Sequence, residues 1–272
     1  MSLVLAVIGA HPGAGTSGVT LAVADAAARL GASTMLVDLS DPARSGLAGV
    51  TDLEGALVAH RPLRWPVRAS RRGQIAVRRL AAGLRPAALA DLPSRDCWLE
   101  HLVGSPDVVV VDTGWDPWPA LGGPVDPIAE WLVAEDTWSA MVVRTTVPSV
   151  RLAAGALDRI DVIGASLDGV VAVNDPAPAG QEAGWPREVL AAAPTALRRL
   201  APSTVFLPWS PEHARTGWTT SSLPRPLLRA GESLLHAAGL PDAQLRLDDS
   251  DRTVPVAKRR WPGTRRHRIA EV

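Results

Sequence analysis

The chain has 272 residues, of which 47% are hydrophobic and 21% charged, enough apolar material for one large folded domain or two small ones. Its 28 basic and 28 acidic side chains cancel, which argues against a protein that coats nucleic acid with its whole surface. No apolar run reaches the roughly 18 residues of a membrane span, the start lacks the basic segment of a signal peptide, and Cys97 is the only cysteine. We therefore expect a cytoplasmic protein without a transmembrane helix, a disulfide framework or a cysteine-rich metal site.

The N-terminal part predicts a strand, a glycine-rich loop, a helix and a second strand. Residues 3–9 form a continuous apolar run, typical of a strand buried on both faces of a parallel sheet. Small residues follow at 10–18, and the Ala-rich stretch 19–30 has helical spacing and ends before Gly31. Residues 34–38 form a second apolar strand. Together these segments predict a βαβ unit.

Strands and helices continue to alternate along the chain. We predict further strands at 74–79, 107–112, 139–144, 167–174 and 204–207, and helices at 147–160, 187–200 and 224–239, with a helical region at 86–103 that breaks near Pro93. This alternation predicts an α/β fold with a mostly parallel, doubly wound sheet and helices on both faces. Residues 1–240 are expected to form this domain. Residues 241–272 are acidic, then basic, and contain helix-breaking prolines, so they predict a disordered tail.

The loop after the first predicted strand has the spacing of a phosphate-binding loop. Gly13 and Gly18 flank four residues, and Thr20 follows as in the pattern G-x-x-x-x-G-K-[ST]. Glycines let backbone N–H groups face a phosphate, and a helix N-terminus favours its negative charge. Val19 stands at the lysine position, and Lys258 is the only lysine in the chain. The loop therefore predicts a phosphate cradle without its usual ammonium group.

Several segments resemble, in the same order, the MinD/ParA group of P-loop ATPases, which includes the CpaE/TadZ-type pilus and septum-site proteins. Besides the glycine-rich loop they are residues 38–42, 107–114, 146–151, 169–174 and 207–209. In that family the loop carries an early signature lysine and a late P-loop lysine, and these positions fall on Ala14 and Val19. The resemblance implies the P-loop NTPase fold with a degenerate Walker A loop that lacks both lysines.

The resemblance also gives roles to the aspartates. Asp38 matches the start of the family's switch I segment, and the aspartate that orients water corresponds to Ser40 or, with one inserted residue, to Asp41. Asp112 ends the strand that resembles Walker B and takes the Mg²⁺-linked position, with the Thr20 hydroxyl as the second metal ligand. The alternative is that these carboxylates cap helices or accept hydrogen bonds from loop amides.

ATP and Mg²⁺ are the ligands that the resemblance implies. Asn174 corresponds to the residue that reads adenine and Pro208 to the proline that packs near the base. The candidate nucleotide-binding residues are Gly13, Ala14, Gly15, Thr16, Ser17, Gly18, Val19, Thr20, Asn174 and Pro208. The alternative is a structural βα turn that binds nothing, with Asn174 as a turn residue.

The chain keeps the family's segments in order but lacks the two lysines of the loop. This combination predicts an ATPase homologue with impaired catalysis. Such a protein would act as a regulatory or scaffolding partner in cellular positioning, at the septum, the pole, a pilus or secretion system, or in partition. We expect it to form a homodimer or a heterodimer with a related ATPase. The alternative is an active NTPase that uses backbone amides, Mg²⁺ and an arginine supplied in trans.

Two basic stretches give a third hypothesis, a docking module. Arg61–Arg85 contains eight arginines and no acidic residue, and Arg252–Arg268 is basic as well. Such runs bind DNA phosphate, anionic membrane or an acidic protein, and membrane contact would make the protein peripheral. The alternative is a solvated surface strip.

Overall fold

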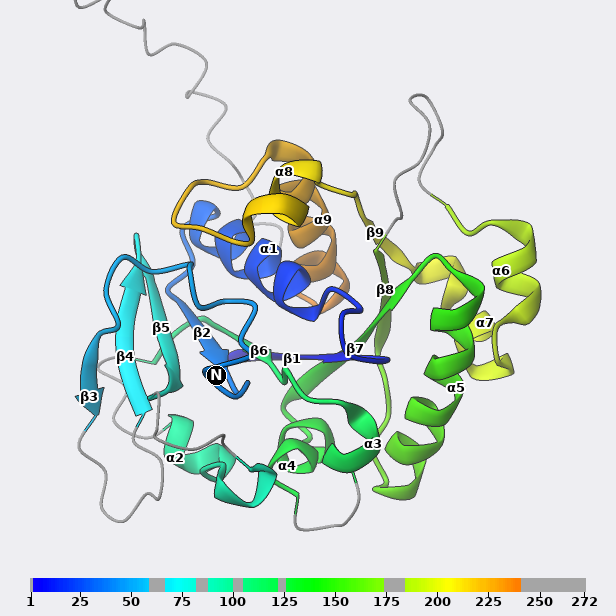
Figure 1. Cartoon of the computed structure of the whole chain (residues 1–272), viewed down its shortest axis with the longest axis horizontal. Coiled ribbons are helices and arrows are strands. Elements are labelled where there is room, and N and C mark those ends of the chain that lie inside the picture. The colour runs from blue at the N-terminus through cyan, green and yellow to red at the C-terminus, as the bar shows by residue number, and fades with distance from the viewer. Residues whose placement is uncertain are drawn as a thin grey trace, which may run out of the picture.

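The structure is a computed structural model that describes residues 2–58, 67–81, 88–99, 105–121, 126–173 and 184–240. These residues form a nine-stranded sheet with helices on both faces (Figure 1), which confirms the predicted α/β class. The predicted tail, 241–272, lies outside the described residues. Within the described ranges, no helix combines the length and the apolar character needed to cross a membrane.

The sheet has the strand order β3-β4-β5-β2-β6-β1-β7-β8-β9. Its strands are β1 (Leu3–Gly9), β2 (Thr34–Asp38), β3 (Ala56–Val58), β4 (Val67–Arg72), β5 (Ile75–Leu80), β6 (Val108–Asp112), β7 (Thr137–Arg144), β8 (Gly169–Val173) and β9 (Val205–Leu207). From β5 to β9 along this order, neighbouring strands are parallel. The pairs β3–β4 and β4–β5 are antiparallel. The sheet is thus mostly parallel, as predicted, with an antiparallel extension at one edge.

The helices lie in two layers (Figure 1). On one side are α1 (Thr16–Arg29), α8 (Pro211–Thr216) and α9 (Arg225–Ala237). On the other are α2 (Arg95–Leu99), α3 (Pro117–Ala120), α4 (Pro127–Val133), α5 (Val147–Val162), α6 (Arg187–Ala192) and α7 (Thr195–Leu200), with 3₁₀ turns at Leu89–Asp91 and Ala201–Ser203. Helices on both faces explain why the central parallel strands β1, β2 and β6 are largely apolar.

Prolines divide two of the predicted helices. The predicted helix 187–200 is α6 followed by α7, with Pro194 between them. The predicted helix 86–103 is, in its described part, a 3₁₀ turn and the short α2, with Pro93 between them. Proline lacks an N–H and disfavours the helical conformation of the residue before it. The predicted strand 74–79 is β5, whose hairpin partner β4 the sequence analysis missed.

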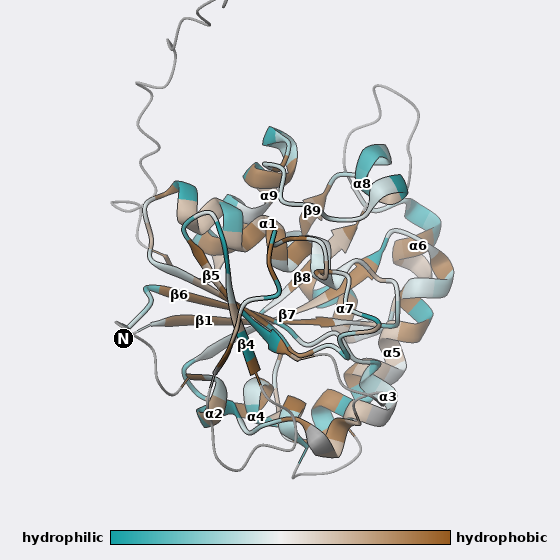
Figure 2. Ribbon diagram, turned by 60° about the vertical axis from the view of Figure 1, so that its left-hand side comes forward, coloured by the Kyte–Doolittle hydropathy of each residue, from teal (hydrophilic) through white to brown (hydrophobic). Residues whose placement is uncertain are grey.

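Alternate side chains of β1 enter two separate hydrophobic cores. Leu5 and Val7 are buried on the side of α1 and α9, and Ile8 is buried on the side of α4 and α5. The central strands β1 and β6 are hydrophobic along most of their length (Figure 2). The helices α1 and α9 pack so closely that a Cβ at Gly231 would collide with the carbonyl of Ala22. This packing fixes α1 against the sheet and so fixes the loop that precedes it.

Candidate functional site

The glycine-rich loop turns at the carboxyl edge of the sheet and opens directly into α1. Gly13 and Gly15 have φ angles of 80° and 108°, which only glycine adopts without strain. A Cβ at Gly15 would also lie 2.9 Å from Cγ2 of Val173, at the end of β8. Among the described residues, no backbone carbonyl accepts a hydrogen bond from the N–H of Thr16 or Ser17. These N–H groups are therefore available to an anion at the helix N-terminus.

The structure corrects the predicted register of this loop by three residues. The predicted lysine position, Val19, is fully buried in the core, and the predicted metal ligand, Thr20, is also fully buried. The Thr20 hydroxyl donates to the carbonyl of Thr16 at 2.9 Å, one turn back along the helix. In the P-loop pattern the Lys-Ser/Thr pair follows the last glycine where the helix begins. Here the helix begins after Gly15, so Thr16 takes the lysine position and Ser17 the hydroxyl position.

The same shift moves the early lysine position from Ala14 to His11. Ala14 is 1% exposed and lies in the core under α1. The His11 ring has Nε2 2.8 Å from Oγ of Ser149 and Nδ1 2.8 Å from the carbonyl oxygen of Pro12. In the corrected register His11 and Thr16 take the two lysine positions. The described part of the loop still has no ammonium group.

Two buried aspartates end neighbouring strands beside this loop. Asp38 of β2 and Asp112 of β6 are paired in register, and they are 1% and 0% exposed. The Asp38 carboxylate accepts hydrogen bonds from the Ser40 N–H at 3.0 Å and from the Ser45 hydroxyl at 2.5 Å. In Asp112, Oδ1 accepts from the Gly114 N–H at 3.0 Å, whereas the buried Oδ2 has no partner within the described ranges. Both oxygens of Asp38 thus accept a hydrogen bond, whereas Oδ2 of Asp112 is free to bind a ligand.

Burial governs the ionisation of both carboxyl groups. Desolvation, with the charge of Asp38 as the second cause, raises the pKa of Asp112 to about 7, while the hydroxyl of Ser17 and the N–H of Gly114 oppose the rise. Desolvation also raises the pKa of Asp38, against its hydrogen bonds from Ser45 and Ser40. At neutral pH the pair therefore resists carrying two negative charges. A divalent cation would relieve this cost.

The donor set fits Mg²⁺ held jointly with a phosphate, and not a cage made by the protein alone. The unpartnered Oδ2 of Asp112 and the hydroxyl of Ser17, which acts on that carboxyl, are hard oxygen donors. The described residues contain no cluster of three or more His, Cys, Asp or Glu side chains suited to a metal. Mg²⁺ characteristically takes one or two carboxylates and completes its shell with water and substrate phosphates.

The other predicted site residues have local roles or lie outside the described residues. Asp41 is 8% exposed, and its carboxylate accepts from the Ala43 N–H at 3.0 Å, which forms a turn in the loop after β2. Pro208 directly follows β9 at the same edge of the sheet. Asn174 lies outside the described residues, although its neighbour Val173 contacts the glycine-rich loop.

No protein-family model matches the sequence, and no curated protein matches it. The fold, however, matches solved structures. One is the septum site-determining protein MinD of Pyrococcus horikoshii, complexed with Mg-ADP, with a TM-score of 0.55 and 15% identity over 88% of this chain and 98% of that one. Another is a plasmid partition protein of Borrelia burgdorferi bound to AMPPNP, with a TM-score of 0.54 and 11% identity over 87% and 98%. A third is the MinC:MinD cell division complex of Aquifex aeolicus, with a TM-score of 0.50 and 16% identity over 94% and 98%.

The chain has the fold of the MinD/ParA-type P-loop ATPases. In this chain the loop before α1 and the ends of β2 and β6 come together and bring Ser17, Asp38 and Asp112 to one edge of the sheet.

The described part of the basic stretch Arg61–Arg85, residues 67–81, is the hairpin β4–β5 in the antiparallel extension of the sheet. The arginines there bind their own chain: Arg68 binds Gly55 and Glu54, Arg71 binds Gly73 and Gln74, Arg72 binds Asp25, Arg78 binds Trp98, and Arg79 binds Ala48 and Thr51. Arg72 and Arg78 are only 7% and 8% exposed. The described part is therefore not a uniform solvated strip, because Arg72 and Arg78 are buried while Arg71 is exposed. The rest of the stretch and Arg252–Arg268 lie outside the described residues.

Proposed function

We propose that this chain is a MinD/ParA-like ATPase homologue with impaired hydrolysis that acts as a regulatory or scaffolding partner in cellular positioning. Septum, pole, pilus or secretion systems and partition are the processes to which this role applies. The observation that carries the proposal is the pairing of an anion-ready loop at Thr16 and Ser17 with neutral side chains where the loop needs an ammonium group. The similar folds belong to a septum site-determining protein and a plasmid partition protein, which supports this class of process.

Binding of a nucleotide would rest on the backbone of the loop. The N–H groups of Thr16 and Ser17, with the dipole of α1, attract a phosphate, and the left-handed turns at Gly13 and Gly15 allow it to approach. Ser17 and Asp112 are the residues that would hold Mg²⁺. The bound ion would neutralise phosphate charge.

Hydrolysis would lack the cation that stabilises the transferring phosphoryl group. The Thr16 side chain is uncharged, and the His11 ring is already within hydrogen-bond distance of Ser149. Removing one donor that stabilises transition-state charge typically lowers kcat by about 10²–10³-fold, or roughly 3–4 kcal/mol of barrier. We therefore expect this chain to bind the nucleotide but not to hydrolyse it efficiently.

Titration calorimetry and a phosphate-release assay test the two halves of the proposal. We expect Mg²⁺-dependent binding of ATP that Asp112→Ala weakens, and no turnover above background. Asp158→Ala, at an exposed position of α5, is the matched control and should leave binding unchanged. Robust turnover by the purified chain would overturn the claim of impaired hydrolysis.

The second candidate is an active NTPase that receives an arginine from a partner. In the described hairpin, Arg79 acts electrostatically on Asp38, but its guanidinium is bound to Ala48 and Thr51. This candidate therefore takes its cation from a partner, in trans. Turnover that rises with protein concentration and disappears in Asp112→Ala would favour this candidate.

We also propose association through the loop face, with a second copy or a related ATPase. The MinC:MinD complex among the similar folds supports a partner role of this kind. Sedimentation analysis with and without Mg·ATP would test self-association, and a nucleotide-independent monomer would exclude a homodimer.

A further inference from the structure

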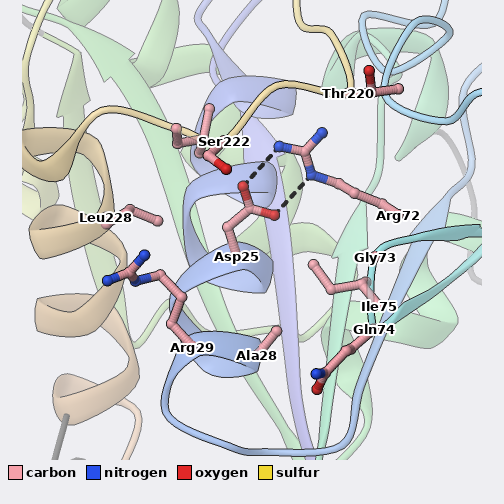
Figure 3. A pocket seen from close by; sticks show the side chains of 11 residues that line it. Asp25, Ala28, Arg29, Arg72, Gly73, Gln74, Ile75, Thr220, Ser222 and Leu228 are labelled. Atoms are coloured by element: carbon pink, nitrogen blue, oxygen red, sulfur yellow. Dashed lines mark hydrogen bonds and ion pairs between the residues drawn. The ribbon is translucent and has the colours of Figure 1, made fainter. Parts of the chain in front are cut away.

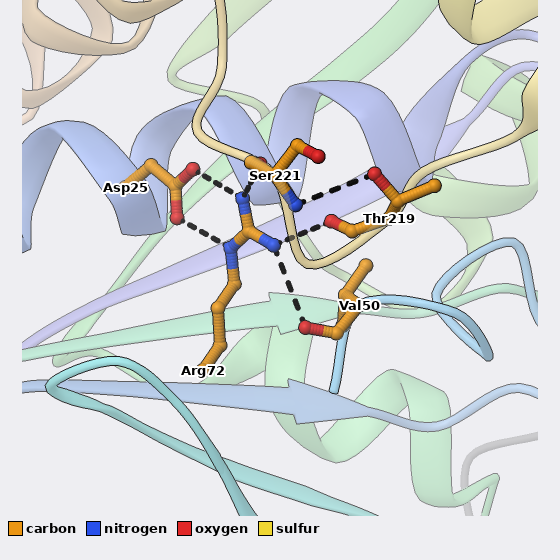
Figure 4. Close-up of polar contacts among 5 residues, drawn as sticks. All are labelled: Asp25, Val50, Arg72, Thr219 and Ser221. Carbon is orange, nitrogen blue, oxygen red and sulfur yellow. Dashed lines mark hydrogen bonds and ion pairs between the residues drawn. The ribbon is translucent and has the colours of Figure 1, made fainter. Parts of the chain in front are cut away.

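Arg72 lies at the end of β4 and joins three segments that are far apart in the sequence (Figure 4). Its Nε and Nη2 each donate to one carboxylate oxygen of Asp25 on α1, both at 2.8 Å. Nη2 also donates to the carbonyl of Ser221 at 2.7 Å, and Nη1 to the carbonyls of Thr219 at 2.6 Å and Val50 at 3.4 Å. The guanidinium thus uses every N–H it has, in a site where the Arg72 side chain is 6% exposed.

The carbonyls that Arg72 binds belong to two segments, which we name by their residues. Val50 lies in the β2 loop, residues 39–53, which also carries Ser45, the hydrogen-bond partner of Asp38. Thr219 and Ser221 lie in the strap, residues 217–224, which links α8 to α9. One buried side chain therefore holds both segments against α1.

The same two segments cover the first turn of α1. A Cβ at Gly46, in the β2 loop, would lie 2.6 Å from Oγ of Ser17. In the strap, the indole of Trp218 packs directly against Gly18, where a Cβ would collide with the ring. The two covers also touch each other, since a Cβ at Gly49 would lie 2.7 Å from the carbonyl oxygen of Trp218. Both therefore lie next to the residues that would bind phosphate and Mg²⁺.

Packing alone does not hold the strap. Behind it lies a cavity of about 430 Å³ between α1, the turn of the β4–β5 hairpin and the start of α9 (Figure 3). Thr220 and Ser222 line this cavity and are exposed, so they contribute little buried surface there. Apart from Trp218 and Leu223, the strap is fixed mainly by its hydrogen bonds to Arg72. The cavity gives it space into which it can move.

We propose that Arg72 is a positioning residue that latches the strap and the β2 loop over the first turn of α1, and that a nucleotide enters the phosphate cradle only when this latch opens. The gating half rests on the proposed function, because it takes the cradle to be a nucleotide site. The latching half rests only on the contacts of Arg72 and is testable without a ligand.

Hydrogen exchange followed by mass spectrometry tests the latch. Arg72→Lys keeps the charge and loses the bidentate pair and most of the carbonyl bonds. We expect amide exchange in 39–53 and 217–224 to accelerate at least about tenfold, with exchange in β6 unchanged as proof of folding. Arg71→Lys is the matched control, because Arg71 is exposed and, among the described residues, binds only the carbonyls of Gly73 and Gln74. Unchanged exchange in both segments of the Arg72→Lys protein would overturn the latch.

A milder variant keeps the latch testable if the Arg72→Lys protein does not fold. Asp25→Asn keeps the volume of the side chain but removes the charge that orients the Arg72 guanidinium. It should accelerate exchange in the same two segments by a smaller factor than Arg72→Lys. Acceleration confined to α1, or spread evenly over the sheet, would contradict the latch.

Stopped-flow binding of a fluorescent ATP analogue carrying an N-methylanthraniloyl group tests the gate. We expect Arg72→Lys to raise the association rate constant several-fold over that of the natural chain and of Arg71→Lys. Accelerated exchange with an unchanged association rate would refute the gate and leave nucleotide binding intact. If neither protein binds the analogue, nucleotide binding and the gate both fail, while the exchange data still decide the latch.

Discussion

Asp38 and Asp112 are direct neighbours in the parallel register of β2 and β6, and both carboxyl groups are buried at the carboxyl edge of the sheet. In the described part of the loop, no lysine compensates their charge. Because the second charge is costly, protons and divalent cations compete for the pair. This relationship makes the stability of the protein and its affinity for Mg²⁺ depend on pH in opposite ways.

The stability of the natural chain should fall with rising pH because of Asp112. Its pKa is about 7 in the folded protein and 3.8 in a model peptide, so between these values the folded state binds more protons than the unfolded one. The stabilisation is complete below the unfolded pKa and is lost as the pH rises through about 7. Asp112→Asn stays neutral, so its stability relative to the natural chain should increase by about 2–3 kcal/mol from roughly pH 5 to pH 8.

Urea unfolding of both proteins at several pH values measures this difference directly. Asp168→Asn is a suitable control, because Asp168 also accepts a backbone N–H, that of Ser139, but has no buried acidic partner in strand register. A stability difference between Asp112→Asn and the natural chain that stays constant with pH would contradict the assigned ionisation.

Mg²⁺ should stabilise the protein at alkaline pH and lose this effect in acid. The ion binds the ionised form of the Asp112 carboxylate, and below about pH 6 the proton occupies that oxygen. If the free ion exceeds its dissociation constant about tenfold, the gain is about 1.4 kcal/mol. Thermal unfolding with and without MgCl₂ checks this. Asp112→Asn should abolish the shift and Ser17→Ala should reduce it, whereas an equal shift in all three proteins would indicate a site elsewhere.

The corrected loop register predicts opposite outcomes for two lysine substitutions. Thr16→Lys puts an ammonium group at the start of α1, where it can reach a bound phosphate, and should tighten ATP binding about tenfold or more, since a charged hydrogen bond contributes roughly 1.5–3 kcal/mol. Val19→Lys buries an ammonium group in a fully enclosed core position and should destabilise the fold by at least about 3 kcal/mol. Calorimetry and urea unfolding distinguish them. If Val19→Lys were stable and bound ATP more tightly, the original register would be right.

The sequence predicted the central strands because they depend on local signals. Strands buried on both faces are largely apolar, and β1, β2 and β6 show such runs. The resemblance singled out Asp38 and Asp112, and the structure pairs them because the carboxyl ends of parallel strands share one edge. Their burial and their coupled ionisation depend on the loops above them, which the pattern of residues does not encode.

The register of the loop was missed because the residue that requires glycine at position 18 lies far along the chain. The spacing from Gly13 to Gly18 imitates a P-loop, yet Gly18 is a helical residue that makes room for Trp218. The strand β4, the hairpin partner of the predicted β5, was missed for a similar reason. Its arginines look like a solvated run, but the partner of Arg72, Asp25, lies on α1.

Two helical glycines under tryptophan rings should respond oppositely to alanine. In an exposed helix, Gly→Ala usually stabilises by about 0.5–1 kcal/mol. At Gly155 of α5, a Cβ would lie 3.5 Å from the ring of Trp118, an ordinary contact, so we expect Gly155→Ala to stabilise the protein. At Gly18 of α1, the Cβ would collide with the ring of Trp218, so Gly18→Ala should destabilise it by about 1–3 kcal/mol.

A double-mutant cycle identifies Trp218 as the cause. Trp218→Ala removes the ring, so adding Gly18→Ala in that background should cost much less than it does in the natural chain, with a coupling energy of about 1 kcal/mol or more. The strap then loses its contact with α1, and exchange in 217–224 should accelerate while Arg72 remains in place. If the effects of the two substitutions on the free energy of unfolding are additive, Trp218 is not the reason why position 18 requires glycine. The strap then does not pack against the first turn of α1.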